Sequence, residues 1–233
     1  MRLIFILLFA SFFLLAKDVK VAAAANVGYA LEEIVKLYKM AYPHSDIKIT
    51  IGSSGKLAAQ IENGAGYDIF LSADTSYPKR LYEKNLTYTK PVVYATGKLI
   101  LASRNHIGSL DDIKIASRLA VANPKTAPYG KAAFEFLKSY GAYRSVKDKL
   151  VFGESVAQTL IYTLKAADMG LIAKSALYGA NIPKLHYIDI PQNRYAPIKQ
   201  AMVLIKPDED AGRFFLFLLS KKSAEVFKRY GYD

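Results

Sequence analysis

Small or polar residues separate an apolar run from a helical pattern at four places in this sequence. The four segments are VAAAANVGYALEEIVKLY, ITIGSSGKLAAQIENG, VANPKTAPYGKAAFEFL and VFGESVAQTLIYTLKAA. Each is typical of a strand that runs directly into the N-terminus of a helix. Such an N-terminus exposes unpaired backbone N–H groups and carries about +0.5 of an elementary charge, so it binds anions readily. Since none of the segments carries a set of catalytic groups, they predict an anion-binding site rather than a catalytic centre.

Three of these junctions also carry a side chain that can form hydrogen bonds, namely Asn26, Ser54 and Ser155. An amide or hydroxyl donor beside free backbone amides suits a fully deprotonated oxyanion. The same residue types are common helix N-caps, so for each of them alone the capping role is the alternative. Because Ser155 and Gln158 have the spacing of a capping box, we assign Ser155 to the cap.

The sequence offers little support for an enzyme. GSSGK comes close to the GxSxG nucleophile elbow of hydrolases, with Gly52 before Ser54, but Lys56 stands in place of the second glycine. A histidine is available later at His186, yet no local pattern marks it. An exported esterase-like hydrolase is therefore a remote alternative. No HExxH motif, cysteine ligand or nucleotide-binding loop is present in the sequence, and we expect neither a bound metal cation nor a cofactor.

Apolar runs that alternate with helical patterns predict an α/β fold with mostly parallel sheets and crossover helices. The expected strands are Val19 to Ala24, Ile47 to Gly52, Ile69 to Ala73, Lys98 to Ser103, Leu119 to Asn123, Leu150 to Phe152, Met169 to Ala173, Leu185 to Ile190 and Ala201 to Ile205. One long helix is expected from Ala211 to Tyr230.

Two long extended segments, 91–103 and 191–205, indicate that the chain crosses to a second lobe and returns. We therefore expect lobe I to comprise residues 17–106 and 192–233, and lobe II to comprise residues 107–191. In open α/β sheets, ligands bind beyond the carboxyl ends of the strands. Two lobes that face each other would bring all four strand-to-helix turns into one cleft.

The first residues have the pattern of a secretory signal peptide. Arg2 precedes an apolar run from Leu3 to Ala16, which is short for a membrane span, and charged residues follow it. We expect cleavage after Ala16 and a periplasmic protein, with an uncleaved anchor as the alternative. Because the sequence contains no cysteine, it has neither disulfides nor the thiol on which bacterial lipoproteins are anchored.

The formal net charge is +12. The basic residues are scattered along the chain and often lie at helical spacing from acidic ones. Since the chain is also expected to be exported, nucleic acid is not an expected partner. We expect a monomer.

Several stretches resemble the periplasmic molybdate-binding proteins of ABC transporters. They are AAAANVGYALEEI, GSSGKLAAQIENGAGYDIFLSAD, NPKTAPYGKAA and AEVFKRYGY, and the likeness extends over nearly the whole chain after residue 16. The resemblance implies a two-lobed type II periplasmic binding fold that closes on molybdate or tungstate and delivers it to a membrane permease. In that family backbone amides and neutral side chains hold the ion. By position, the contacts fall on Ala25, Asn26, Ser54, Tyr129 and Val156.

The resemblance leaves three points open. Ala173 stands where some members of the family have a tyrosine whose hydroxyl reaches the ion, so we expect that contact to be missing. Lys56 and Lys125 are adjacent to the proposed donors, and a direct contact between either lysine and the ion is the alternative to neutral donors alone. Another tetrahedral oxyanion such as sulfate is the alternative ligand, and the sequence does not separate molybdate from tungstate.

Overall fold

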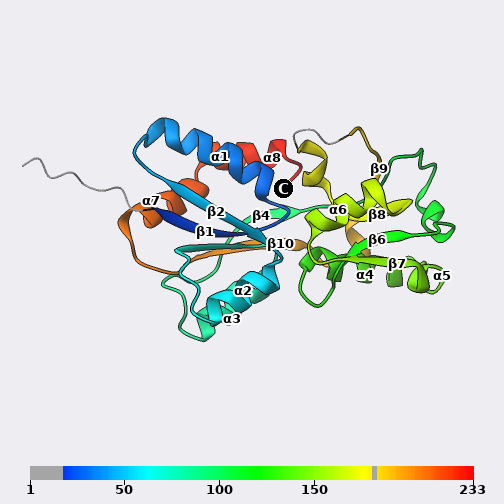
Figure 1. Ribbon diagram of the computed structural model, residues 1–233, viewed down its shortest axis with the longest axis horizontal. Coiled ribbons are helices and arrows are strands. Elements are labelled where there is room, and N and C mark those ends of the chain that lie inside the picture. Colours follow the sequence, from blue (N-terminus) through cyan, green and yellow to red (C-terminus); the bar gives the residue numbers. More distant parts are fainter. Residues whose placement is uncertain (1–17, 180–182) are drawn as a thin grey trace, which may run out of the picture.

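The computed structural model describes residues 18–179 and 183–233. In this part of the chain two α/β lobes lie side by side, each built on a five-stranded sheet with helices on both faces (Figure 1). This confirms the two-lobed α/β architecture that the sequence predicts. The expected signal peptide, residues 1–16, falls outside the described residues.

The sheet of the first lobe has the strand order β2-β1-β3-β10-β4. β1, β2 and β3 pair in parallel, whereas β10 runs antiparallel to both β3 and β4. The bounds are β1 Val19–Ala24, β2 Ile47–Gly52, β3 Ile69–Ser72, β4 Val92–Gly97 and β10 Ile198–Leu204. The carboxyl ends of β1, β2 and β3 therefore meet at one edge of this sheet, as parallel strands require.

The sheet of the second lobe repeats this plan with the order β7-β6-β8-β5-β9. β7, β6 and β8 are parallel, and β5 runs antiparallel to β8 and β9. The bounds are β5 Leu99–Ser103, β6 Leu119–Ala122, β7 Leu150–Gly153, β8 Met169–Ala173 and β9 His186–Asp189. In both lobes the strand that arrives from the other lobe is the antiparallel one.

The chain first crosses between the lobes at Lys98, which separates β4 from β5. The expectation that lobe I extends to residue 106 is therefore wrong, because residues 99–103 form β5 in the sheet of lobe II. Thr96, Gly97 and Lys98 interrupt the apolar residues at this point, but such a short break does not show that the chain enters a different sheet. The chain returns through residues 190–197, between β9 and β10.

Helices cover both faces of the first sheet (Figure 1). On one face, β1 residues such as Val21 pack with α1, α7 and α8, and on the other face Ala22 packs with α2 and α3. The bounds are α1 Gly28–Ala41, α2 Ser54–Glu62, α3 Ser76–Glu83, α7 Glu209–Leu218 and α8 Lys221–Arg229. Helix α1 buries Leu31, Ile34 and Tyr38, which lie on one stripe because they are spaced three and four residues apart.

The second lobe has its own apolar core, which includes Phe136 of α4 and Leu160 of α6. Its helices are α4 Pro128–Ser139, α5 Tyr143–Val146 and α6 Val156–Lys165. Short 3-10 helices occur at η1 Leu110–Lys114, η2 Lys147–Lys149, η3 Lys174–Tyr178 and η4 Gln192–Arg194. Each lobe thus presents its strand-to-helix turns to the other lobe.

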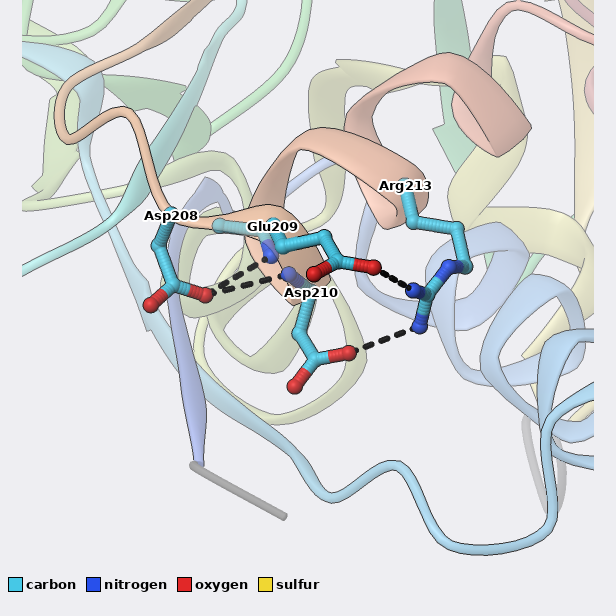
Figure 2. Close-up of polar contacts among 5 residues, drawn as sticks. Asp208, Glu209, Asp210 and Arg213 are labelled. Carbon is cyan, nitrogen blue, oxygen red and sulfur yellow. Dashed lines mark hydrogen bonds and ion pairs between the residues drawn. The ribbon is translucent and has the colours of Figure 1, made fainter. Parts of the chain in front are cut away.

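The single helix expected from Ala211 to Tyr230 is two helices. The first of them, α7, ends at Leu218. The second, α8, is capped by Ser220, whose hydroxyl accepts a hydrogen bond from Ser223 N–H. Figure 2 shows the start of α7, where an Asp208 carboxylate oxygen accepts from the amides of Asp210 and Ala211. An aspartate at this position also interacts favourably with the helix dipole.

Arg213 ties the first turn of α7 together (Figure 2). Its guanidinium donates to Asp210 Oδ1 at 2.7 Å and to Glu209 Oε1 at 2.6 Å. It also lies over the ring of Tyr42, with 5.4 Å between Cζ and the ring centroid. The contact with Tyr42 fastens α7 to the segment that follows α1. No helix in residues 18–179 or 183–233 has the length and apolar character needed to span a membrane.

Candidate anion-binding site

Four strand-to-helix turns meet between the lobes around one small cavity. From the first lobe come the turn after β1 and the start of α2; from the second come the starts of α4 and α6. All five residues that the resemblance implies as contacts line this cavity, namely Ala25, Asn26, Ser54, Tyr129 and Val156. The fold thus brings together residues that are up to 131 positions apart in the sequence.

Free backbone amides are available around this cavity. Within the described residues, the N–H groups of Asn26, Ser54, Tyr129 and Val156 make no hydrogen bond to another backbone group. The last three stand in the first turn of α2, α4 and α6, where no carbonyl four residues earlier is in position to accept. Ala25 differs, because its N–H donates to the carbonyl of Gly52 at 2.9 Å. The cavity lining therefore includes at least one free amide from each of the four turns.

Ser53 adds a hydroxyl that the sequence pattern did not assign to the site. Its side chain lines the cavity, is only 5% exposed, and has an Oγ atom without a hydrogen-bond partner in the described structure. Ser53 is the N-cap residue of α2, yet its side chain does not bond to the helix. A buried hydroxyl without a partner costs free energy, so a ligand that accepts a hydrogen bond from it would relieve that cost.

The hydroxyl of Ser54, by contrast, already has a structural partner. Its Oγ accepts a bond from the N–H of Ala73 at 2.9 Å, and the O–H remains able to donate. Ser155 is a cap, as predicted, because its Oγ accepts from Gln158 N–H at 3.3 Å. In a full capping box, Gln158 would also accept a bond from the N–H of Ser155. Here Gln158 Oε1 accepts instead from the N–H of the preceding residue, Glu154.

The carboxamide of Asn26 is bonded to groups within the protein. Its Nδ2 donates to Gln200 Oε1 at 2.8 Å and to Tyr232 Oη at 2.9 Å. Both hydrogens of the amide group are thereby used. The expected role of this side chain as an anion donor is not seen in this arrangement, and the free donor of Asn26 is its backbone N–H. Pairings across 174 and 206 residues could not be inferred from the local pattern around Asn26.

Three tyrosines surround this Asn26–Gln200 pair, the buried Tyr129 and Tyr232 and the partly buried Tyr94. Tyr94 Oη donates to Gln200 Oε1 at 2.9 Å, and Tyr129 Oη accepts from Gln200 Nε2 at 3.3 Å. Burial raises the pKa of Tyr232 to about 12 and raises the pKa values of Tyr94 and Tyr129 well above their ordinary value. All three phenols are therefore neutral at physiological pH. They supply hydrogen bonds without adding negative charge beside the cavity.

No charged side chain is among the residues that line the cavity. Lys56 Nζ instead forms an ion pair with Glu154 at 2.6 Å across the opening between the lobes, and both side chains are largely exposed. Lys125 is also exposed. The two lysines adjacent to the expected donors thus lie outside the cavity, which leaves a lining of neutral donors.

Hydrogen bonds that join the two lobes hold the cavity closed. The N–H of Gly55 donates to the carbonyl of Thr126 at 2.9 Å, and Tyr77 Oη donates to the carbonyl of Lys125 at 3.3 Å. Ser175 Oγ donates to the carbonyl of Asn26 at 2.8 Å. Asn26 lines the cavity and Gly55 follows Ser54 of its lining, whereas Tyr77 and Ser175 come from α3 and η3. The cavity lining therefore includes turns from both lobes.

The histidines provide no competing metal site. Pairing of β5 with β9 brings the rings of His106 and His186 to a centroid distance of 5.7 Å, although they are far apart in the sequence. Within the described residues, however, no group of three or more histidine, cysteine or acidic side chains could hold a metal ion.

Because the phenol of Tyr232 is buried, we predict that the protein loses stability in alkali. Between pH 10 and pH 12 this phenol ionises in the unfolded chain but not in the folded protein, so the free energy of unfolding falls as the pH rises. Relative to Tyr232→Phe, the parent should lose about 1.4 kcal/mol of stability between pH 8 and pH 11. Urea unfolding of both proteins at the two pH values measures this. An equal loss in both proteins would contradict the assignment.

Comparison with known proteins shows where this chain belongs. Residues 19–233 match the model of the family of bacterial extracellular solute-binding proteins. The molybdate-binding protein ModA of Rhodobacter capsulatus is 34% identical over 229 residues, which cover 93% of this chain and 88% of that protein. ModA of Azotobacter vinelandii is also 34% identical, with 93% and 90% covered.

The solved structure of the periplasmic molybdate-binding protein of Azotobacter vinelandii superposes on this chain with a TM-score of 0.84 at 30% identity. The match covers 92% of this chain and 98% of that one. The likeness therefore includes both lobes and the turns between them. The chain belongs to the family of bacterial extracellular solute-binding proteins.

Proposed function

We propose that this protein captures molybdate, and also tungstate, and delivers it to the permease of an ABC transporter. The observation that carries the proposal is the convergence of four free amides, from Asn26, Ser54, Tyr129 and Val156, on one cavity between the lobes whose lining has no charged side chain. The relatives named as molybdate-binding proteins support this ligand, since they match the chain over nearly its whole length.

A lining of neutral donors suits a fully deprotonated tetrahedral dianion. Three helix N-termini and the turn before α1 together supply roughly +2 of partial charge to such an ion. A singly protonated phosphate also needs an acceptor for its hydrogen, and the cavity lining contains no carboxylate. The ion would be released when the lobes separate and the four turns move apart.

The same hydrogen-bond donors could hold sulfate, which we keep as the second candidate. In either case Ala25, Asn26, Ser54, Tyr129 and Val156 are the proposed contacts, to which we add the Ser53 hydroxyl. Ala173 at the end of β8 is fully buried and offers no hydroxyl. Ser53 Oγ is the additional donor that compensates for it in this proposal.

The further details of this function are also proposals. The protein is a binding protein rather than an enzyme, and it acts in the periplasm as a monomer after loss of residues 1–16, without a lipid anchor. Its partners are the oxyanion and the membrane permease, and nucleic acid is not among them. It needs no cofactor.

Isothermal titration calorimetry tests the ligand. Residues 17–233 are titrated with molybdate, tungstate, sulfate and phosphate, and we expect one-to-one binding of the first two with no measurable heat from phosphate. Ser53→Ala should weaken molybdate binding about tenfold, because a hydrogen bond to a charged group contributes about 1.5 kcal/mol. Ser223→Ala, which removes a buried hydroxyl between α7 and α8, is the matched control.

The titration tests both the identity of the ligand and the existence of the site. Tight binding of sulfate with molybdate silent would replace the ligand while keeping the site. Silence from all four anions would overturn the proposed function and would reduce the four helix starts to caps.

A further inference from the structure

The carbonyl and the carboxamide of Asn26 are held by side chains from three other segments of the chain. Tyr232 Oη donates to the Asn26 carbonyl at 2.7 Å, and Ser175 Oγ donates to the same oxygen at 2.8 Å. Gln200 and Tyr232 also accept from the carboxamide. All four residues are at most 4% exposed. Because the carbonyl and the side chain of Asn26 are both anchored, and both are attached to the same Cα, the position of its backbone nitrogen is set by buried tertiary contacts.

Helix α1 itself gives Asn26 little local support. The N-cap residue of α1 is Val27, which has no side-chain cap. The turn that carries Asn26 thus depends on Tyr232 and Gln200 where another helix would depend on a polar cap.

Gln200 also contacts the opposite lobe. It lies on β10, where the pairing with β4 shifts register between Gln200 and Ala201. From there Gln200 Nε2 reaches Tyr129 Oη at 3.3 Å, and Tyr129 begins α4 with its free amide at the cavity. One fully buried side chain is therefore bonded to two of the four anion-facing elements, one in each lobe.

We propose that Gln200 and Tyr232 are positioning residues of the anion site, which hold Asn26 and Tyr129 in place, and with them their backbone amides, although neither of them lines the cavity. The inference rests on the proposed function and extends it to residues outside the cavity. The bonds Gln200 to Tyr129 and Ser175 to Asn26 join the two lobes, so they form only on closure. Closure thereby completes the placement of both amides and slows release of the ion.

A purely structural role would have a different signature. Buried hydrogen bonds stabilise a protein wherever they lie, and their loss lowers the Tm. Only a positioning role also changes the affinity and the release rate of protein that is already folded. Both are therefore measured at 25 °C, well below unfolding.

Tyr232→Phe is the first test, since it deletes only the hydroxyl that bonds twice to Asn26. We expect the Kd for molybdate to rise about tenfold, equivalent to about 1.4 kcal/mol, mainly through faster dissociation in stopped flow. Tyr129→Phe deletes the acceptor of the Gln200 bond but keeps the Tyr129 amide, and a rise of about threefold is expected. The second variant keeps the test decisive if the first does not fold.

Ser103→Ala is the control, because its buried hydroxyl donates to the carbonyl of Asp168 at the far end of lobe II. It should lower the Tm and leave the Kd unchanged. If the two tyrosine variants behave like this control, the positioning role is overturned while the proposed function stands. If the parent protein binds none of the four anions, the proposed function fails and this inference fails with it. If the parent binds sulfate instead, the same comparison is made with sulfate.

Discussion

Replacement of Gly130 with alanine is expected to raise the Kd for molybdate about 100-fold and to lower the free energy of unfolding by about 3 kcal/mol. Gly130 is the third residue of α4, and a Cβ atom there would lie 2.3 Å from the carbonyl oxygen of Ala122, the last residue of β6. The other close atoms, at 2.8 Å, are backbone carbons of Ala122 and Asn123. Since no flexible side chain can yield, the start of α4 must lift away from the strand and carry the Tyr129 amide with it.

The control for this variant is Gly212→Ala in α7, where an added Cβ meets no atom within 4 Å. It should leave the affinity unchanged and raise stability slightly, because alanine favours a helix interior over glycine. Calorimetric titration and urea unfolding of both variants provide the comparison. A Gly130→Ala protein that is destabilised but binds within about threefold of the parent would show that the Tyr129 amide does not contribute to the site.

Replacement of Gly55 with alanine is expected to raise the Kd about 30-fold without lowering the stability of the ligand-free protein. The added Cβ would lie 2.7 Å from Tyr77 Oη and 3.0 Å from the carbonyl oxygen of Thr126. Thr126 belongs to the other lobe, and Tyr77, on α3 of the same lobe as Gly55, is held against that other lobe by its bond to the Lys125 carbonyl. The methyl group therefore acts as a wedge in the closed form. Overpacking of this kind costs about 2 kcal/mol, which corresponds to the expected loss of affinity.

In a form with separated lobes, the added methyl group of the Gly55→Ala variant has no contact with Thr126, and the Tyr77 side chain, without its bond to Lys125, can turn away from it. The substitution also removes a glycine from the first turn of α2. The Tm without ligand should therefore match or exceed that of the parent, and Gly212→Ala again serves as the control. Thermal unfolding with and without molybdate separates the two effects. An unchanged Kd would mean that Gly55 and Thr126 are not in close contact when the ion is bound.

Local sequence pattern accounts for much of the fold. The strands Val19–Ala24, Ile47–Gly52 and Met169–Ala173 have the bounds that their apolar runs predict. Burial on both faces of a sheet produces the nearly continuous apolar runs of β1 and β8, whereas β2 at the sheet edge alternates apolar and polar residues. Small residues after β1 and β2 mark helix starts. The four junctions that line the cavity were for this reason visible in the sequence.

The boundary between the lobes was harder to predict from the sequence. β4 and β5 form one extended run through Lys98, and only the pairing of β5 with β8 and β9 places it in the second sheet. A strand is apolar in either sheet, so composition does not show which partner it takes. The break between α7 and α8 has a local signal, since Ser220 is a typical N-cap, but the helical pattern continues on both sides of it.

The sequence by itself determined which residues stand at the helix starts, because backbone amides are free at any helix N-terminus whatever the side chain. Only the tertiary structure decided which side chains face the cavity. Asn26 turns its carboxamide to Gln200 and Tyr232, Ser54 Oγ bonds to Ala73, and Ser53 keeps a free hydroxyl. The physical reason is that a polar side chain takes the best hydrogen-bond partner that packing brings within about 3 Å, and these partners come from distant parts of the chain.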